Sequence, residues 1–100
     1  MIFEGGINGV YRMALDTYGA TAQTLMCFEE MAELQKELCK HARGADNAEH
    51  IAEEIADVRI MLDQMAVLHD CGGLAANYKT AKLERLLNRL EEVKHEKADT

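Results

Sequence analysis

The chain has 100 residues, of which 48% are hydrophobic and 29% are charged, and its formal net charge is −7. This length suffices for one domain with a modest core, which association with other chains would enlarge. The excess of 18 acidic over 11 basic residues argues against a general nucleic-acid-binding protein, which needs a basic surface to displace counterions from phosphates.

The composition favours helices over strands. Ala, Leu, Glu and Met make up 43 residues, Val, Ile and Thr only 14, and proline is absent. The three cysteines include no C-x-x-C pair, which argues against a disulfide framework or a zinc site. No apolar run approaches the roughly 20 residues of a membrane span, and the N-terminus lacks the basic and apolar regions of a signal peptide. We therefore expect a single all-α domain over residues 1–100, located in the reducing cytoplasm and without a membrane partner.

Two helices are expected in the first part of the chain. The first spans about residues 8–18 and ends at Gly19, and the second spans about residues 21–42 and ends at Gly44. The apolar residues of the second helix cover about half of its circumference. An arc of this width predicts contacts on two sides, in a bundle or an oligomer. The arc consists of Cys27, Phe28, Met31, Ala32, Leu34, Leu38 and Cys39.

Two more helices are expected after Gly44, so that the second and third form a long antiparallel hairpin in a four-helix, bundle-like fold. The third helix begins after Asp46 or Asn47 and continues to about Leu68, and the glycines in 69–73 predict a break. The fourth spans about residues 75–97 and carries a stripe at helical spacing, made of Leu83, Leu86, Leu87, Leu90 and Val93. The expected N-caps are Asn8, Thr21 and Asp46, the last in a capping box with Glu49.

Two acidic pairs lie on the predicted hairpin. Glu30 and Glu33 are three residues apart on one helix, and Glu54 and Asp57 have the same spacing on the next, so each pair shares a helix surface. Mg²⁺ prefers oxygen ligands, and helical bundles that bind metal in their cores present carboxylates from facing helices. Folding the hairpin back would bring the four carboxylates together.

The alternative is that these residues lie on solvated helix faces, where such spacings are common. Glu30 and Glu33 are compatible with that alternative, because Glu30 borders the apolar arc and Glu33 lies further into the polar face. Glu54 is not, because it falls within the apolar stripe of its helix, with Asp57 at the edge. A carboxylate on a core face costs several kcal/mol unless it is paired, protonated or bound to metal. A functional acidic site is therefore the favoured interpretation.

The two motifs and their order resemble a known family. E-x-x-E at 30–33, twenty intervening residues and E-x-x-D at 54–57 resemble the MazG-like, all-α nucleoside triphosphate pyrophosphohydrolases, in particular their short phage and bacterial members. Further similarities are Tyr18-Gly19, Gln23, residues 40–44 and the basic element at residues 82–85. The resemblance covers about residues 11–90.

The resemblance implies an enzyme that hydrolyses a (d)NTP to (d)NMP and pyrophosphate with Mg²⁺, or Mn²⁺ in its place. Glu30, Glu33, Glu54 and Asp57 would hold the metal. Lys82 and Arg85 would contact phosphate, and the protein would be a homodimer or homotetramer. Glu33 is our candidate for the catalytic base, with Glu29 and Glu53 as rivals. The alternative is a non-catalytic helical module that binds metal or nucleotide, or an interaction module on the same scaffold.

Two further groups of side chains lie on the second helix. Lys36 and Lys40 share the polar side of the second helix with Glu33 and could reach phosphate, although pairing with neighbouring acids explains them equally well. Cys27 and Cys39 are expected to be reduced core residues.

Overall fold

The structure is a computed structural model that describes residues 5–99, and these residues form helices and no strand. The helices are α1 (Gly6–Tyr18), α2 (Ala20–Ala42), α3 (Ala48–Leu68) and α4 (Gly72–Asp99). The predicted all-α class is thereby confirmed. The chain divides into two units, one holding α1, α2 and α3 and the other holding α4, and each is described by itself. None of the helices in this part of the chain has the length and apolar character needed to cross a membrane.

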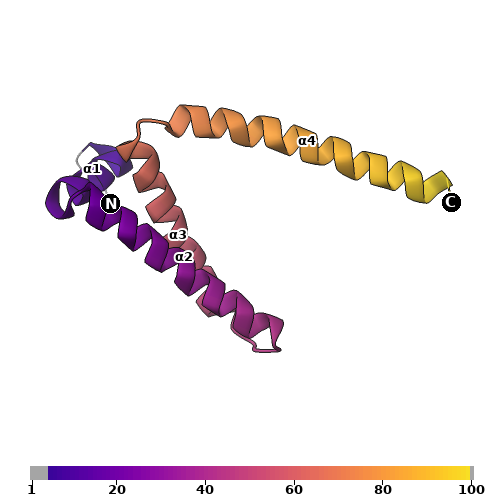
Figure 1. The fold of residues 1–100 in the computed structure, drawn as a ribbon, viewed down its shortest axis with the longest axis horizontal. Helices are drawn as coiled ribbons and strands as arrows, with labels where there is room; N and C mark the ends of the chain where they lie inside the picture. Colours follow the sequence, from indigo (N-terminus) through magenta and orange to yellow (C-terminus); the bar gives the residue numbers. More distant parts are fainter. Residues whose placement is uncertain (1–4, 100) are drawn as a thin grey trace. The chain divides into compact units, whose positions relative to one another are not determined.

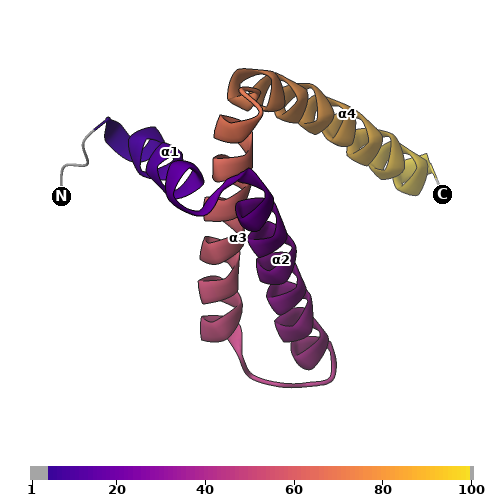
Figure 2. The same cartoon turned by 60° about the vertical axis from the view of Figure 1, so that its left-hand side comes forward.

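The first unit is built on a hairpin of α2 and α3, which lie side by side and run in opposite directions (Figures 1 and 2). The turn begins at Gly44, whose φ of 101° lies in the left-handed region. There the Gly44 amide donates to the carbonyl of His41 at 2.9 Å, and the Ala45 amide donates to that of Lys40 at 3.0 Å. This pair of bonds is the Schellman motif, which satisfies carbonyls left open at a helix end. The predicted helix end at Gly44 is correct.

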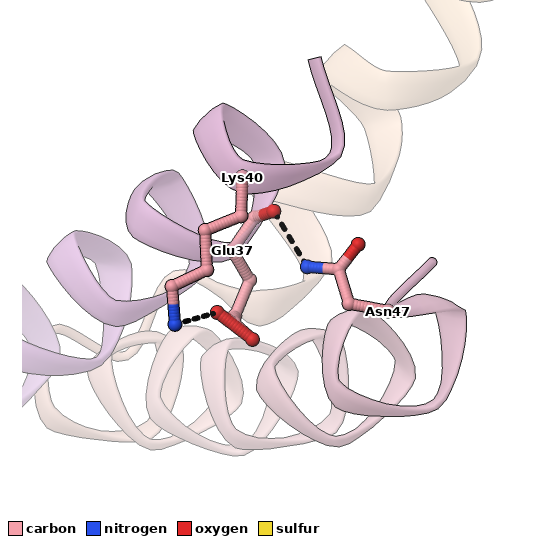
Figure 3. A network of polar contacts seen from close by, with 3 residues as sticks. All are labelled: Glu37, Lys40 and Asn47. Carbon is pink, nitrogen blue, oxygen red and sulfur yellow. Dashed lines mark hydrogen bonds and ion pairs between the residues drawn. The ribbon is translucent and has the colours of Figure 1, made fainter. Parts of the chain in front are cut away.

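A side chain at the start of α3 closes the hairpin. Asn47 is the N-cap of α3, but it makes no side-chain capping bond. Its Nδ2 instead donates to the backbone carbonyl of Glu37 on α2, at 2.9 Å (Figure 3). The predicted capping box of Asp46 and Glu49 is therefore wrong, because the residue at the cap position is Asn47 and its amide is engaged by α2. The Glu37 carboxylate pairs with Lys40 Nζ at 3.1 Å in the same group.

The short helix α1 packs against both α2 and α3. Arg12 Nη2 donates to the carbonyl of Val67 at 3.2 Å, and the Leu15 side chain is buried. The predicted caps Asn8 and Thr21 both lie inside the first turns of their helices instead, because α1 begins at Gly6 and α2 follows Gly19 directly. Gly19 ends α1 as predicted.

The core of this unit is small and partly polar. Its buried apolar residues are Leu15, Cys27, Val58 and Met61, and buried polar residues accompany them, namely Gln23, Glu37, Asn47 and Gln64. The predicted apolar arc of α2 is covered on one side only. Most of its members are exposed, including Phe28, Met31, Leu38 and Cys39. The prediction that Cys39 is a core residue is therefore wrong, whereas Cys27 is buried as expected.

Helix α4 begins earlier than predicted. The Ala75 amide donates to the carbonyl of Cys71 at 2.8 Å, which makes Gly72 and Gly73 part of the first helical turn. The break is confined to His69, Asp70 and Cys71, where Asp70 has a φ of 49°. The two glycines therefore do not interrupt the helix, since glycine is tolerated near a helix start. All five members of the predicted stripe are exposed on α4.

We expect Asn47→Ala to lower the free energy of unfolding by about 1 kcal/mol, because it deletes one net hydrogen bond between α3 and α2. Asp46→Ala is the matched control. Asp46 is exposed, and α3 has no side-chain capping bond, so its effect should stay within about 0.5 kcal/mol. Urea unfolding of both variants measures the difference, and an equal or larger effect at Asp46 would contradict the observed role of Asn47.

Candidate metal centre

Three of the four predicted carboxylates meet in the seam between α2 and α3. Glu30, Glu54 and Asp57 each place one carboxylate oxygen so that these atoms all lie within 4.8 Å of one another. Glu54 and Asp57 are one turn apart on α3, and Glu30 faces them from α2, as the antiparallel hairpin requires. We call these three residues the acidic trio. Side chains from two different elements thus converge on a space of the size that one cation occupies.

The acidic trio is half-buried rather than solvated. Each of the three residues has intermediate exposure, and Oε2 of Glu54 is buried without a hydrogen-bond partner. No Lys or Arg of residues 5–99 is seen to form an ion pair with the trio, and the observed ion pair near the hairpin tip is that between Lys40 and Glu37. Buried acceptors without partners are rare in folded proteins. The residues therefore fit a divalent cation, which prefers such oxygen ligands.

The electrostatics of the acidic trio oppose three simultaneous negative charges. Burial raises the pKa of Glu30, and the charges of Asp57 and Glu54 and a hydrogen bond shared with Asp57 raise it further. Burial also raises the pKa of Glu54, followed by the charges of Asp57 and Glu33. Both shifts favour the neutral acid. A bound cation would reverse this preference, because it stabilises the ionised carboxylates.

Glu33, the fourth predicted ligand, lies outside the acidic trio. Its side chain is exposed, yet its charge contributes to the raised pKa of both Glu30 and Glu54. It is thus close to the site without sharing its oxygens, and its role as ligand or base stays a prediction. The two rival bases, Glu29 and Glu53, are also exposed.

Glu37 is a buried carboxylate that the sequence reasoning missed. A hydrogen bond from Lys40 is the main cause that lowers the pKa of Glu37, although burial opposes it. Its charge in turn raises the pKa of Glu54, so it lies near the site. The missed signal is its spacing of seven residues from Glu30, which keeps both on one helix face. Lys40, considered above for phosphate contact, is committed to Glu37.

The predicted phosphate-binding residues Lys82 and Arg85 lie on α4, in the second unit. Both side chains are exposed there. They lie one turn apart on one helix, so a single phosphate group could reach both. Their role stays a prediction.

Comparisons of the chain with protein-family models, with curated proteins and with solved structures find no match. The case for a function therefore depends on the geometry of the acidic trio and on the pattern of the two motifs.

We expect the metal-free protein to lose stability as pH rises. With raised pKa values at Glu30 and Glu54, the folded chain binds more protons than the unfolded chain between the ordinary and the raised pKa. The free energy of unfolding then falls as pH rises through that window. Glu37 has the opposite sign, because its pKa is lowered and its contribution is lost as pH falls. Glu54→Gln should flatten the decline and exceed the parent protein in stability at neutral pH.

Urea unfolding in chelator, from acidic to neutral pH, measures this slope. Glu49→Gln serves as control because Glu49 lies on the same helix, is exposed and does not contribute to the raised pKa of Glu30 or Glu54, and its profile should follow that of the parent. Parallel profiles for the parent and Glu54→Gln would show that Glu54 is an ordinary surface carboxylate.

We expect Mg²⁺ or Mn²⁺ to raise the melting temperature. A ligand at about 100 times its Kd contributes about 2.7 kcal/mol to folding, which corresponds to roughly ten degrees or more for a domain of this size. Asp57→Asn and Glu54→Gln should lose the shift, and Glu33→Gln should lose it only if Glu33 is a ligand. Potassium chloride at equal ionic strength is the control, and an identical rise with that salt would mean general screening in place of a site.

Proposed function

We propose that the chain is a metal-dependent nucleoside triphosphate pyrophosphohydrolase, which converts a (d)NTP and water to (d)NMP and pyrophosphate in the cytoplasm. The observation that carries this proposal is the meeting of Glu30, Glu54 and Asp57 within 4.8 Å. The motifs on which these residues lie, and their order, resemble those of the MazG-like enzymes. The resemblance supplies the reaction, and the trio supplies a place for the metal that the reaction needs.

We assign metal binding, proton transfer and phosphate contact to different residues of the chain. Glu30, Glu54 and Asp57 would hold Mg²⁺ through carboxylate oxygens, and the ion would supply neutralisation of the triphosphate and a bound water of lowered pKa. Glu33 lies beside the trio and is exposed to solvent, so it can accept a proton from an attacking water without giving up a metal ligand. Lys82 and Arg85 would stabilise negative charge on the phosphates. Glu37 would keep Lys40 at the hairpin tip.

The second candidate is a helical module that binds metal or nucleotide without turnover. It is favoured by the position of Glu33, since only three of the four predicted ligands come together. Both candidates include self-association as a homodimer or homotetramer, which would cover the exposed apolar residues of α2.

We expect the purified protein to release pyrophosphate from at least one member of a panel of ribo- and deoxyribonucleoside triphosphates with Mg²⁺ or Mn²⁺. Glu54→Gln should lower kcat by about a hundredfold or more, since it removes a ligand of the catalytic metal. Glu49→Gln, on the same helix and exposed, should retain activity. The products are separated by chromatography.

Each other outcome has a defined meaning. Release of single phosphate would contradict the assigned reaction. Saturable nucleotide binding without turnover would favour the binding module. A Glu33→Gln variant that binds metal normally, yet loses activity and the alkaline limb of the pH profile, would support Glu33 as the base.

A further inference from the structure

The stripe of α4 has the spacing of a coiled-coil seam. Leu83 and Leu90 are seven residues apart and take heptad position a, and Leu86 and Val93 take position d. Leu87 follows at position e. All five side chains are between 46% and 57% exposed, which for residues of this size on one face leaves a continuous apolar surface. Apolar patches of this kind mark interaction sites.

We propose that this stripe is the surface on which two copies of the chain pair, with their α4 helices antiparallel. The proposal deepens the self-association stated above and is independent of the hydrolase activity. Charge complementarity along the helix indicates the occupant. Before the middle of the stripe, residues 79–88 carry a net positive charge, with three bases, Lys79, Lys82 and Arg85, and one acid, Glu84. Residues 89–97 carry three acids, Glu91, Glu92 and Glu96, and three bases, Arg89, Lys94 and Lys97. Two copies in opposite directions therefore place the positive half of each helix beside the half of the other that holds most of the acids.

The apolar layers match in this orientation. When two such helices run in opposite directions, each a position meets a d position of the other. Leu83 then packs against Val93 of the partner subunit, and Leu86 packs against Leu90 of the partner subunit. The two-fold axis repeats both layers, so no member of the four-residue seam is left without an apolar partner. Leu87 meets its own copy on one flank and extends the apolar contact.

The flanking charges also distinguish the two orientations. In the antiparallel pair each flank carries the same heptad position from both helices, so Lys82 faces Glu96 of the partner subunit, twice. Arg89 faces its own copy once, near the axis. In a parallel pair Lys82 would instead face Leu87 of the partner subunit, and Arg89 would face Lys94 of the partner subunit twice. In the next layer of the seam, Lys79 at position d would lie opposite Lys97 of the partner subunit at position a, twice, and in a parallel pair each of these lysines would face its own copy. Two attractive pairs with three repulsive pairs favour the antiparallel arrangement over four repulsive pairs.

The length of the stripe limits the strength of the pairing. From 83 to 93 it spans roughly 16 Å of helix, less than the three or four heptads of a sustained coiled coil. The pairing is therefore reversible and depends on protein concentration. In the paired state Lys82 faces Glu96 of the partner subunit, so the phosphate contact proposed above for Lys82 and Arg85 would then fall to Arg85, at heptad position c on the outer face.

Sedimentation equilibrium of the full chain over a wide concentration range tests the pairing. The parent protein should self-associate, and Lys82→Glu or Glu96→Lys alone should raise the dissociation constant about tenfold, because each creates two like-charge contacts. The double variant should return close to the parent value. Glu92→Lys, with the same change in charge on the opposite face of α4, is the matched control.

Rescue in the double variant supports the antiparallel register, because Lys82 and Glu96 do not meet in a parallel pair. Additive losses without rescue would overturn the register, and a parent chain that stays monomeric throughout would overturn the surface. Circular dichroism of each variant must show unchanged helix content. The readout is mass, so failure here leaves the pyrophosphate assay unaffected, and an inert protein can still pair.

Discussion

The packing interface between α2 and α3 contains a cluster of carboxylates that repel one another, and the same interface stabilises the hairpin. Glu30, Glu54 and Asp57 occupy positions that helix packing fills with apolar side chains in most hairpins. Burial and the repulsion between these carboxylates raise the pKa of Glu30 and of Glu54 in the absence of a cation. The apolar core that offsets the electrostatic cost is small, and its buried members in the described part of the chain are Leu15, Cys27, Val58 and Met61. The same carboxylates that would bind metal therefore lower the stability of this unit when no metal is bound.

The polar character of the seam extends beyond the acidic trio. Gln64 is buried two turns from Asp57 on α3, and Asn47 is buried two turns before Glu54. Each has a buried side-chain oxygen without a partner, as does Glu54. The three orphan acceptors thus share one face of α3. These three oxygens lower the stability of the seam, because a buried acceptor without a partner has lost its hydrogen bonds to water.

Much of the fold could be predicted from the sequence, because the helix ends at Gly19 and Gly44 follow from glycine's access to positive φ. The convergence of Glu30 with Glu54 and Asp57 follows from spacing and from a tight turn. The role of Asn47 could not be predicted, since its partner is a backbone carbonyl ten residues away. Glu37 was missed because a helix wheel cannot show that Lys40 neutralises a buried acid.

The helical spacing of an apolar stripe likewise does not predict which element packs against it. The same spacing of three residues describes Val58 and Met61, which are buried, and Leu83 and Leu86, which are exposed. Apolar residues at helical spacing indicate that one face of a helix is buried against a partner. Which element supplies that partner depends on tertiary contacts, and a metal-site role for Glu33 depends on side-chain reach that spacing alone does not determine.

The tight connection that contains the Schellman turn at Gly44 determines where the ligands on α3 lie relative to α2. Only residues 43–47 lie between the last residue of α2 and the first of α3. Their backbone hydrogen bonds and the bond from Asn47 to Glu37 fix the conformation of this connection. One residue added or removed within α3 between Asn47 and Glu54 would shift Glu54 and Asp57 by about 1.5 Å along the helix and turn them by about 100° relative to Asn47. Glu54 and Asp57 would then leave the seam together. The number of residues between Asn47 and Glu54 is therefore set by the site, although Asn47 is no ligand of the site.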